Sequence, residues 1–358
     1  MRFGLIAALC AVSACNPFYV LRAGYEEVCI LARREAIVTR LQDQNLSTVE
    51  RRKLALVLEA RDFAKSIGLT PDNSFTSYAA VDRPVLAWVL AASKPDAFKL
   101  YTWWFPIVGT LPYKGFFEEE EARAAAADLT ELGYETWLRP TDAFSTLGWF
   151  DDPLLSTTLR QSETRLVNIV LHESVHNTLW VAGQAIFSES LANAVAGQAT
   201  KEFFEQKLAA CSLNPICTSE ELSFWKKSAD AAVYEQRQEN DLAQLLTSLF
   251  ADLDQLYRSE IGRAEKLEQR RLIFDRGTAG FRSRYRLETV LREPNNAELI
   301  QLKIYRTGLS DFQHTFESCS RKWPCFWDTI RLVVQAPAEA AENELFEALR
   351  RYNSGTPP

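Results

Sequence analysis

The feature that most constrains this chain is a pair of histidines four residues apart, His172 and His176, with Glu173 directly after the first. The surrounding segment RLVNIVLHESVHNTLW carries apolar residues at helical spacing. Residues four apart on a helix lie one turn above each other on one face. Both imidazoles can therefore reach one ion while Glu173 points into the same cavity. The chain has only three histidines, so this motif holds two of them.

We expect a divalent metal at this motif. Leu166 and Ile169 are apolar and lie on the same helix face as the histidines, so we expect this face to be buried. Burial of two imidazoles and a carboxylate costs free energy unless a charged group pairs with them. Gly183 can end the first helix, and Ser188 can cap a second helix that begins with Glu189. A return helix would bring Glu189 beside the histidines. Two histidines and a glutamate, with one position open for water, are the ligands of a catalytic zinc ion, Zn²⁺.

The residues around this set have expected roles in peptide hydrolysis. Glu173 is expected to be the general base, which takes a proton from a zinc-activated water and delivers it to the leaving amine. Asn193, on the same face as Glu189, is expected to accept the outer N–H of a ligating histidine in the second shell of the metal. The developing oxyanion needs a further donor. The candidates are Tyr305, which we take first, Tyr113 and His314, and each has an ordinary packed or surface role as its alternative.

The order of the predicted elements favours an α+β fold. Aromatic and β-branched runs between about residues 74 and 110 are typical of strands, and the chain is mostly helical from Glu163 onward. We divide one compact unit into an N-terminal α+β part with strands, zinc-binding helices and a helical C-terminal part. These parts cover residues 18–160, 161–200 and 201–352.

The segment before the zinc-binding helices is a candidate for substrate binding. Phe144-Ser145-Thr146-Leu147 is expected to pair with the substrate backbone as an edge strand. Asp151 and Asp152 would attract a free α-amino group, although Asp-Asp-Pro is also a common turn and helix-start signal.

The N-terminus has the pattern of a secretory signal. Arg2 is followed by an apolar run from Phe3 to Ala14, which is shorter than the ~20 residues needed to span a bilayer as a helix. The run ends in Val12-Ser13-Ala14-Cys15, which resembles the lipobox of bacterial lipoproteins.

This resemblance implies a signal peptide over residues 1–14 and a lipidated N-terminus and tether over 15–17, with the lipid on Cys15. Asn16 after the cysteine favours the outer membrane, facing the periplasm, and the lipid would be the only membrane attachment. An ordinary signal peptide cut nearby, or a buried N-terminal helix, is the alternative.

Charge and cysteine content indicate which partners and which compartment to expect. With 40 Lys and Arg against 47 Asp and Glu, the net charge of −7 gives no electrostatic reason to bind nucleic acid. Two pairs of cysteines have the same spacing, one around an Asn-Pro turn and one around a Trp-Pro turn, which predicts two small disulfide loops. Disulfides fit an oxidising compartment. Cys29 is left over as a buried free thiol. The expected pairs are Cys211 with Cys217 and Cys319 with Cys325.

The HExxH helix and the following glutamate resemble the gluzincin metallopeptidases. More narrowly, the segments LPYKGFF, AFSTLGWFDDPLLST, LHESVHNTLW and PNNA are similar to a bacterial lipoprotein family of predicted aminopeptidases. The resemblance implies a zincin-like fold and zinc-dependent hydrolysis of peptides. The chain lacks the Gly-x-Met-Glu-Asn strand with which better-known gluzincins hold a substrate amino terminus, so exopeptidase and endopeptidase both stay open. The alternative is an envelope lipoprotein whose metal site is not catalytic and which binds a peptide or partner.

Overall fold

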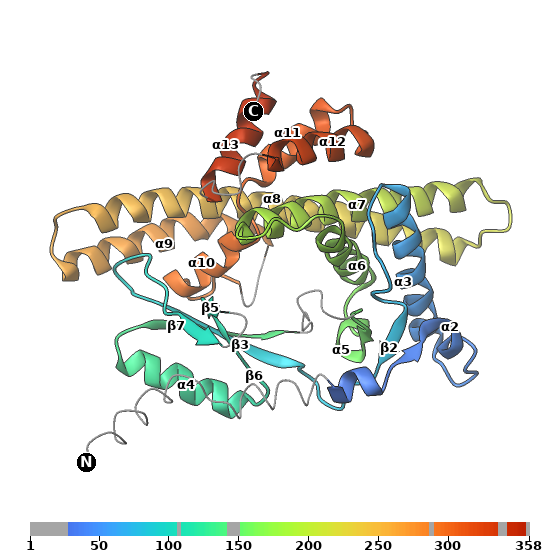
Figure 1. The fold of residues 1–358 in the computed structure, drawn as a ribbon, viewed down its shortest axis with the longest axis horizontal. Helices are drawn as coiled ribbons and strands as arrows, with labels where there is room; N and C mark the ends of the chain where they lie inside the picture. Colours follow the sequence, from blue (N-terminus) through green and yellow to red (C-terminus); the bar gives the residue numbers. More distant parts are fainter. Residues whose placement is uncertain (1–27, 106–108, 142–150, 286–289, 336–341, 356–358) are drawn as a thin grey trace, which may run out of the picture.

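Long helices form the middle layer of the molecule. The structure, a computed structural model, describes residues 28–105, 109–141, 151–285, 290–335 and 342–355. In Figure 1 the helices α7 (Ala185–Leu213), α8 (Ser219–Arg258) and α9 (Arg263–Tyr285) run across the centre of the view. A small sheet lies on one side of them and the C-terminal helices lie on the other. No helix of the described part is long and apolar enough to cross a membrane.

The first described segment includes α3 (Thr48–Ser66), which packs against α6 (Glu163–Thr178), the helix of the two histidines. A capping box joins Ser47 and Glu50 at the start of α3. Before α3, residues 28–32 are helical, and a short strand and one helical turn follow between Glu35 and Arg40. This strand pairs antiparallel with a strand far along the chain, which local periodicity does not reveal. The elements are β1 (Glu35–Ala36), α2 (Ile37–Arg40), β2 (Ser77–Ala79), β8 (Leu154–Leu155) and α5 (Ser156–Leu159), with sheet order β1-β2-β8.

A second sheet of order β6-β3-β7 is antiparallel throughout. One of its faces packs Leu90, Ala92 and Phe116 against Ala122 and Leu129 of the helix α4. The opposite face of the sheet lies toward α10. The strands of this sheet are β3 (Ala87–Ser93), β6 (Lys114–Phe116) and β7 (Glu135–Thr141), and α4 (Glu119–Glu131) and α10 (Asn296–Ile304) lie against it. β4 (Trp103–Phe105) and β5 (Gly109–Leu111) form a separate two-stranded antiparallel sheet.

The helical part contributes to the largest of four clusters of buried apolar residues in the described part of the chain. The largest group of buried apolar residues includes positions from Ile37 to Leu349, so segments before and after the candidate metal helices share it. Phe187 of α7 lies at its centre, with its ring 5.3 Å from those of both Phe312 and Phe346. The remaining helices are α6 (Glu163–Thr178), α11 (Leu309–Ser318), α12 (Trp323–Val334) and α13 (Glu342–Asn353).

Two disulfides close helix connections. Cys211 and Cys217 join the end of α7 to the turn before α8, with Cα atoms 5.4 Å apart. Cys319 and Cys325 join α11 to α12 across 5.6 Å. These are the two pairs expected from the equal spacing. Cys29 is a free cysteine, but it is partly exposed rather than buried, because it lies on a terminal helical turn.

Candidate metal centre

Helices α6 and α7 bring the expected ligands together. Ser162 caps α6, which ends at Thr178, and α7 begins at Ala185 after a turn in which Gly183 has φ +76°. The expected start of α7 at Glu189 is therefore wrong by one helical turn. Ser188 does not cap the helix, because its hydroxyl accepts the N–H of Val181 in the turn (3.2 Å).

The three ligand atoms converge on one point. Nε2 of His172 and Nε2 of His176 lie 3.1 Å apart, and they lie 3.3 and 3.4 Å from Oε2 of Glu189. In a tetrahedral zinc site with bonds of about 2.0–2.1 Å, two ligand atoms lie about 3.3 Å from each other. The spacing of these residues therefore fits one small divalent ion bound by all three.

The unpaired buried atoms and the negative charge of these side chains also favour binding of a cation. Oε2 of Glu189 and Nδ1 of His176 are buried and make no hydrogen bond in the described part of the chain. Burial would raise the pKa of Glu189, but the polar contacts and charges of His172 and His176 lower it to about 2. An anionic carboxylate therefore faces two imidazoles in a site that is largely shielded from water.

Glu173 adds a second negative charge beside the ligands. Burial opposes the charged form of His176, but the contact with Glu189, its charge and that of Glu173 together raise the pKa of His176. Glu173 is half-buried on α6, next in sequence to His172. The ring of Trp180 packs edge-on to His176 at 5.2 Å, and 51% of Trp180 is exposed at the rim.

Two of the three expected oxyanion donors lie near this centre. Tyr305 caps the C-terminus of α10, and its ring lies 6.4 Å from that of His172. Tyr113 lies between β5 and β6. Burial and the charge of Glu189 raise the pKa of both tyrosines, so both remain protonated donors. His314 is exposed on α11 and has no described contact with the ligands.

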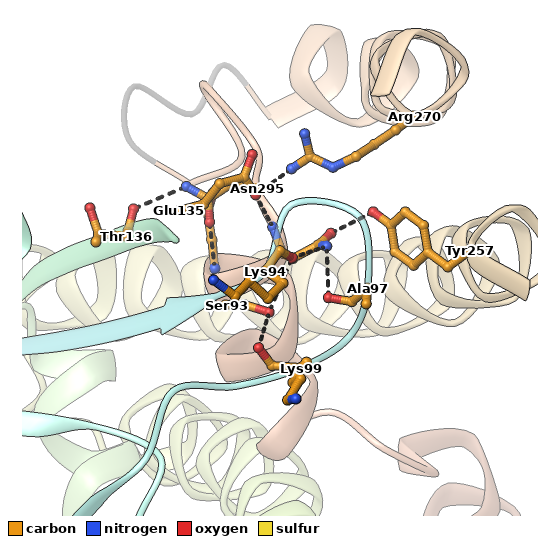
Figure 2. Close-up of polar contacts among 11 residues, drawn as sticks. Ser93, Lys94, Ala97, Lys99, Glu135, Thr136, Tyr257, Arg270 and Asn295 are labelled. Atoms are coloured by element: carbon orange, nitrogen blue, oxygen red, sulfur yellow. Dashed lines mark hydrogen bonds and ion pairs between the residues drawn. The ribbon is translucent and has the colours of Figure 1, made fainter. Parts of the chain in front are cut away.

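The PNNA segment fixes the start of α10, the helix whose C-cap is Tyr305. Figure 2 shows the polar contacts around this start, among them that of Asn295 with Thr136. Asn295 caps the helix and donates to the carbonyl of Thr136 on β7 (3.1 Å). The side-chain oxygen of Asn296 accepts a hydrogen bond from the hydroxyl of Tyr257 (2.8 Å). The backbone N–H of Asn296 donates to Glu135 (3.3 Å). These contacts tie α10 to the sheet and to α8. The sequence singled out PNNA only through its family resemblance.

Asn193 makes no hydrogen bond to a histidine among the described residues, so the expectation that it accepts the N–H of a ligating histidine is wrong. Its amide donates to the carbonyl of Tyr305 (3.1 Å) and to Glu239 (3.4 Å). Glu239 is an ion-pair partner of Arg306 at 2.7 Å, and these groups line a cavity of about 320 Å³ that none of the three ligands lines. The amide of Asn193 is instead directed toward Glu239 on α8 and the end of α10. Sequence reasoning missed Glu239 because α8 carries dense charges along its length.

The other expected positions divide into two groups. Cys15 and the segment Phe144-Ser145-Thr146-Leu147 lie outside the described residues. The backbone carbonyl of Asp152 accepts the N–H of Phe75 (2.8 Å), and that of Asp151 accepts Arg34. The acidic pair thus helps to hold the β2 region.

Comparisons with known proteins identify the family. Residues 18–345 match the model of the family Aminopep, described as "Putative aminopeptidase". No curated protein and no solved structure matches the chain. The match includes α6 and α7, which carry the three converging side chains, and α10. Since it extends over most of the chain, the chain belongs to this aminopeptidase family.

Proposed function

We propose that this chain is a zinc-dependent peptidase in which His172, His176 and Glu189 hold the ion. The family supports a peptidase in general terms, and the zinc assignment goes beyond it. The observation that carries the proposal is the set of three ligand atoms 3.1–3.4 Å apart on two adjacent helices. When bound, the ion would polarise the peptide carbonyl and make a water molecule acidic near neutral pH.

The residues of the chain then perform the proton transfers. Glu173 accepts the proton of the attacking water and returns it to the leaving amine. Tyr305 donates its hydroxyl proton as a hydrogen bond to the developing oxyanion, with Tyr113 as the alternative donor. Burial and the charge of Glu189 keep both phenols protonated, which this role requires. A zincin-like fold is part of this proposal.

A Glu173→Gln variant tests the mechanism. It keeps the size of the side chain and the ligand set, so zinc content should be unchanged while kcat on alanyl peptides falls by about 10²- to 10⁴-fold. Glu131→Gln, at an exposed position on α4, is the control for loss of a carboxylate. Unchanged hydrolysis by Glu173→Gln would refute the general-base role. Comparison of free and N-acetylated peptides separates aminopeptidase from endopeptidase activity.

We also propose that the mature chain is attached to the outer membrane by a lipid on Cys15, facing the periplasm. The lipobox-like Val12-Ser13-Ala14-Cys15 supports this. Metabolic labelling with a palmitate analogue should mark the wild-type protein and leave Cys15→Ser unlabelled. Equal labelling of the two proteins would contradict the assignment.

A further inference from the structure

One face of the β6-β3-β7 sheet looks toward α10 and the candidate metal centre. Side chains alternate between the two faces of a strand. Leu90 and Leu138 pack with α4, so their neighbours Val89 and Arg139 point to the opposite face. Trp137, two residues before Arg139, packs with the α8–α10 cluster, as expected for this face.

The segment before β6, which holds Tyr113, meets the helix that packs on the same face as Arg139. Val89 lies opposite Arg139 on one side and opposite Gly115 on the other. Tyr113 lies just before β6, and the carbonyl of the preceding Pro112 accepts the side-chain amide of Gln301 on α10 (3.4 Å), so this segment lies against the helix that packs on the same face. Strands β6 and β7 flank β3, so about 10 Å separates them.

The charge of Arg139 acts on two tyrosines of the candidate site. Burial and the charge of Glu189 raise the pKa of Tyr113 and of Tyr305, and the positive charge of Arg139 works against both rises. The charge of the guanidinium therefore acts on the hydroxyls of Tyr113, just before β6, and of Tyr305, at the end of α10.

Arg139 has no acidic partner within the described part of the chain. Its described contact is with the ring of Trp137, 5.5 Å from the ring centre. By contrast, Arg270, which reaches this face from α9, is paired with Glu135 at 2.5 Å. A half-buried guanidinium offers a planar set of donors that matches a carboxylate. Its position beside the site suits a charged group of a bound substrate.

We propose that Arg139 binds a carboxylate of the peptide substrate, and that the enzyme prefers short peptides with a carboxylate close to the cleaved bond. This rests on the proposed peptidase function. A cationic amino terminus would be repelled from Arg139 and must lie elsewhere. The carboxylate comes either from the C-terminus of the peptide or from an aspartate or glutamate side chain.

The experiment compares peptides that differ only in this charge. The zinc-loaded full-length chain is assayed on Ala-Ala-Ala, on its C-terminal amide, and on Ala-Ala-Asp amide. We expect kcat/KM for the free acid to exceed that for the amide by about 10- to 100-fold, as for a charge-assisted hydrogen bond. Recovery with Ala-Ala-Asp amide identifies a side-chain carboxylate, and no recovery identifies the C-terminus.

Variants then assign the preference to Arg139. Arg139→Gln should lose it by lowering kcat/KM for the acid alone, and Arg139→Lys should restore part of it. Arg123→Gln, on α4, should leave it unchanged. Equal cleavage of all three peptides by the wild type, or an equal loss on all of them in Arg139→Gln, would overturn the inference and leave the peptidase standing. No cleavage of any peptide by the zinc-loaded wild type would instead overturn the proposed function.

Discussion

Glu298, in the first turn of α10, is a buried carboxyl group without a cationic partner in the described chain. It is 3% exposed, and one of its oxygens accepts the N–H of Leu291 (2.8 Å). Burial raises its pKa from 4.5 to about 7, although the hydrogen bond from Leu291 works against the rise. The folded protein therefore holds a proton on Glu298 near pH 6, which the unfolded chain releases.

The size of this effect follows from linkage. The difference between 4.5 and about 7 corresponds to about 3 kcal/mol of unfolding free energy at ~1.4 kcal/mol for each pH unit. Because the folded pKa is the higher one, the contribution is fully present below pH 4.5. It is lost as the pH rises to about 7 and is constant above that.

The substitution Glu298→Gln removes the titration but keeps an oxygen that can accept the N–H of Leu291. We expect this variant to be more stable than the wild type by up to about 3 kcal/mol at pH 8 and equally stable at pH 4.5. Urea unfolding at pH 4.5, 6 and 8, with the disulfides intact, measures the difference. Glu131→Gln, at an exposed position, should change little at any of these pH values. Parallel pH profiles for Glu298→Gln and the wild type would refute the reasoning.

Two further predictions concern the segment that positions Tyr305. Asn296→Ala leaves buried partners such as the Tyr257 hydroxyl unpaired, so urea unfolding should show a loss of about 2–3 kcal/mol; a loss below about 0.5 kcal/mol would contradict the anchoring role. Tyr305→Phe should lower kcat by about 10²-fold with unchanged zinc content, and the same loss in Tyr113→Phe alone would transfer the oxyanion role to Tyr113.

Local patterns predicted the part of the site that depends on one helix or two consecutive helices. His172, Glu173 and His176 follow from helical spacing, and Glu189 follows because a short turn returns the chain antiparallel to α6. The start of α7 was misplaced because a serine hydroxyl can cap a turn as well as a helix. Ser188 does the former.

Contacts between segments far apart in the chain could not be predicted from the sequence. Asn193 meets Glu239 and Tyr305, which are 46 and 112 residues away, so its partners depend on how α8 and α10 pack. The exposure of Arg139 toward the site depends on strand register, which a single sequence does not determine. The short strand β1 depends on the same kind of long-range pairing.

The most direct test of the account is the zinc content of the purified mature protein. Elemental analysis after zinc loading and dialysis should give one zinc per chain, since the ligand atoms of His172, His176 and Glu189 converge on one point. A variant that replaces both histidines by alanine should take up none. Binding of one zinc by the wild type and its loss in this variant is the predicted result; a wild-type protein that neither contains nor takes up zinc would contradict the central claim.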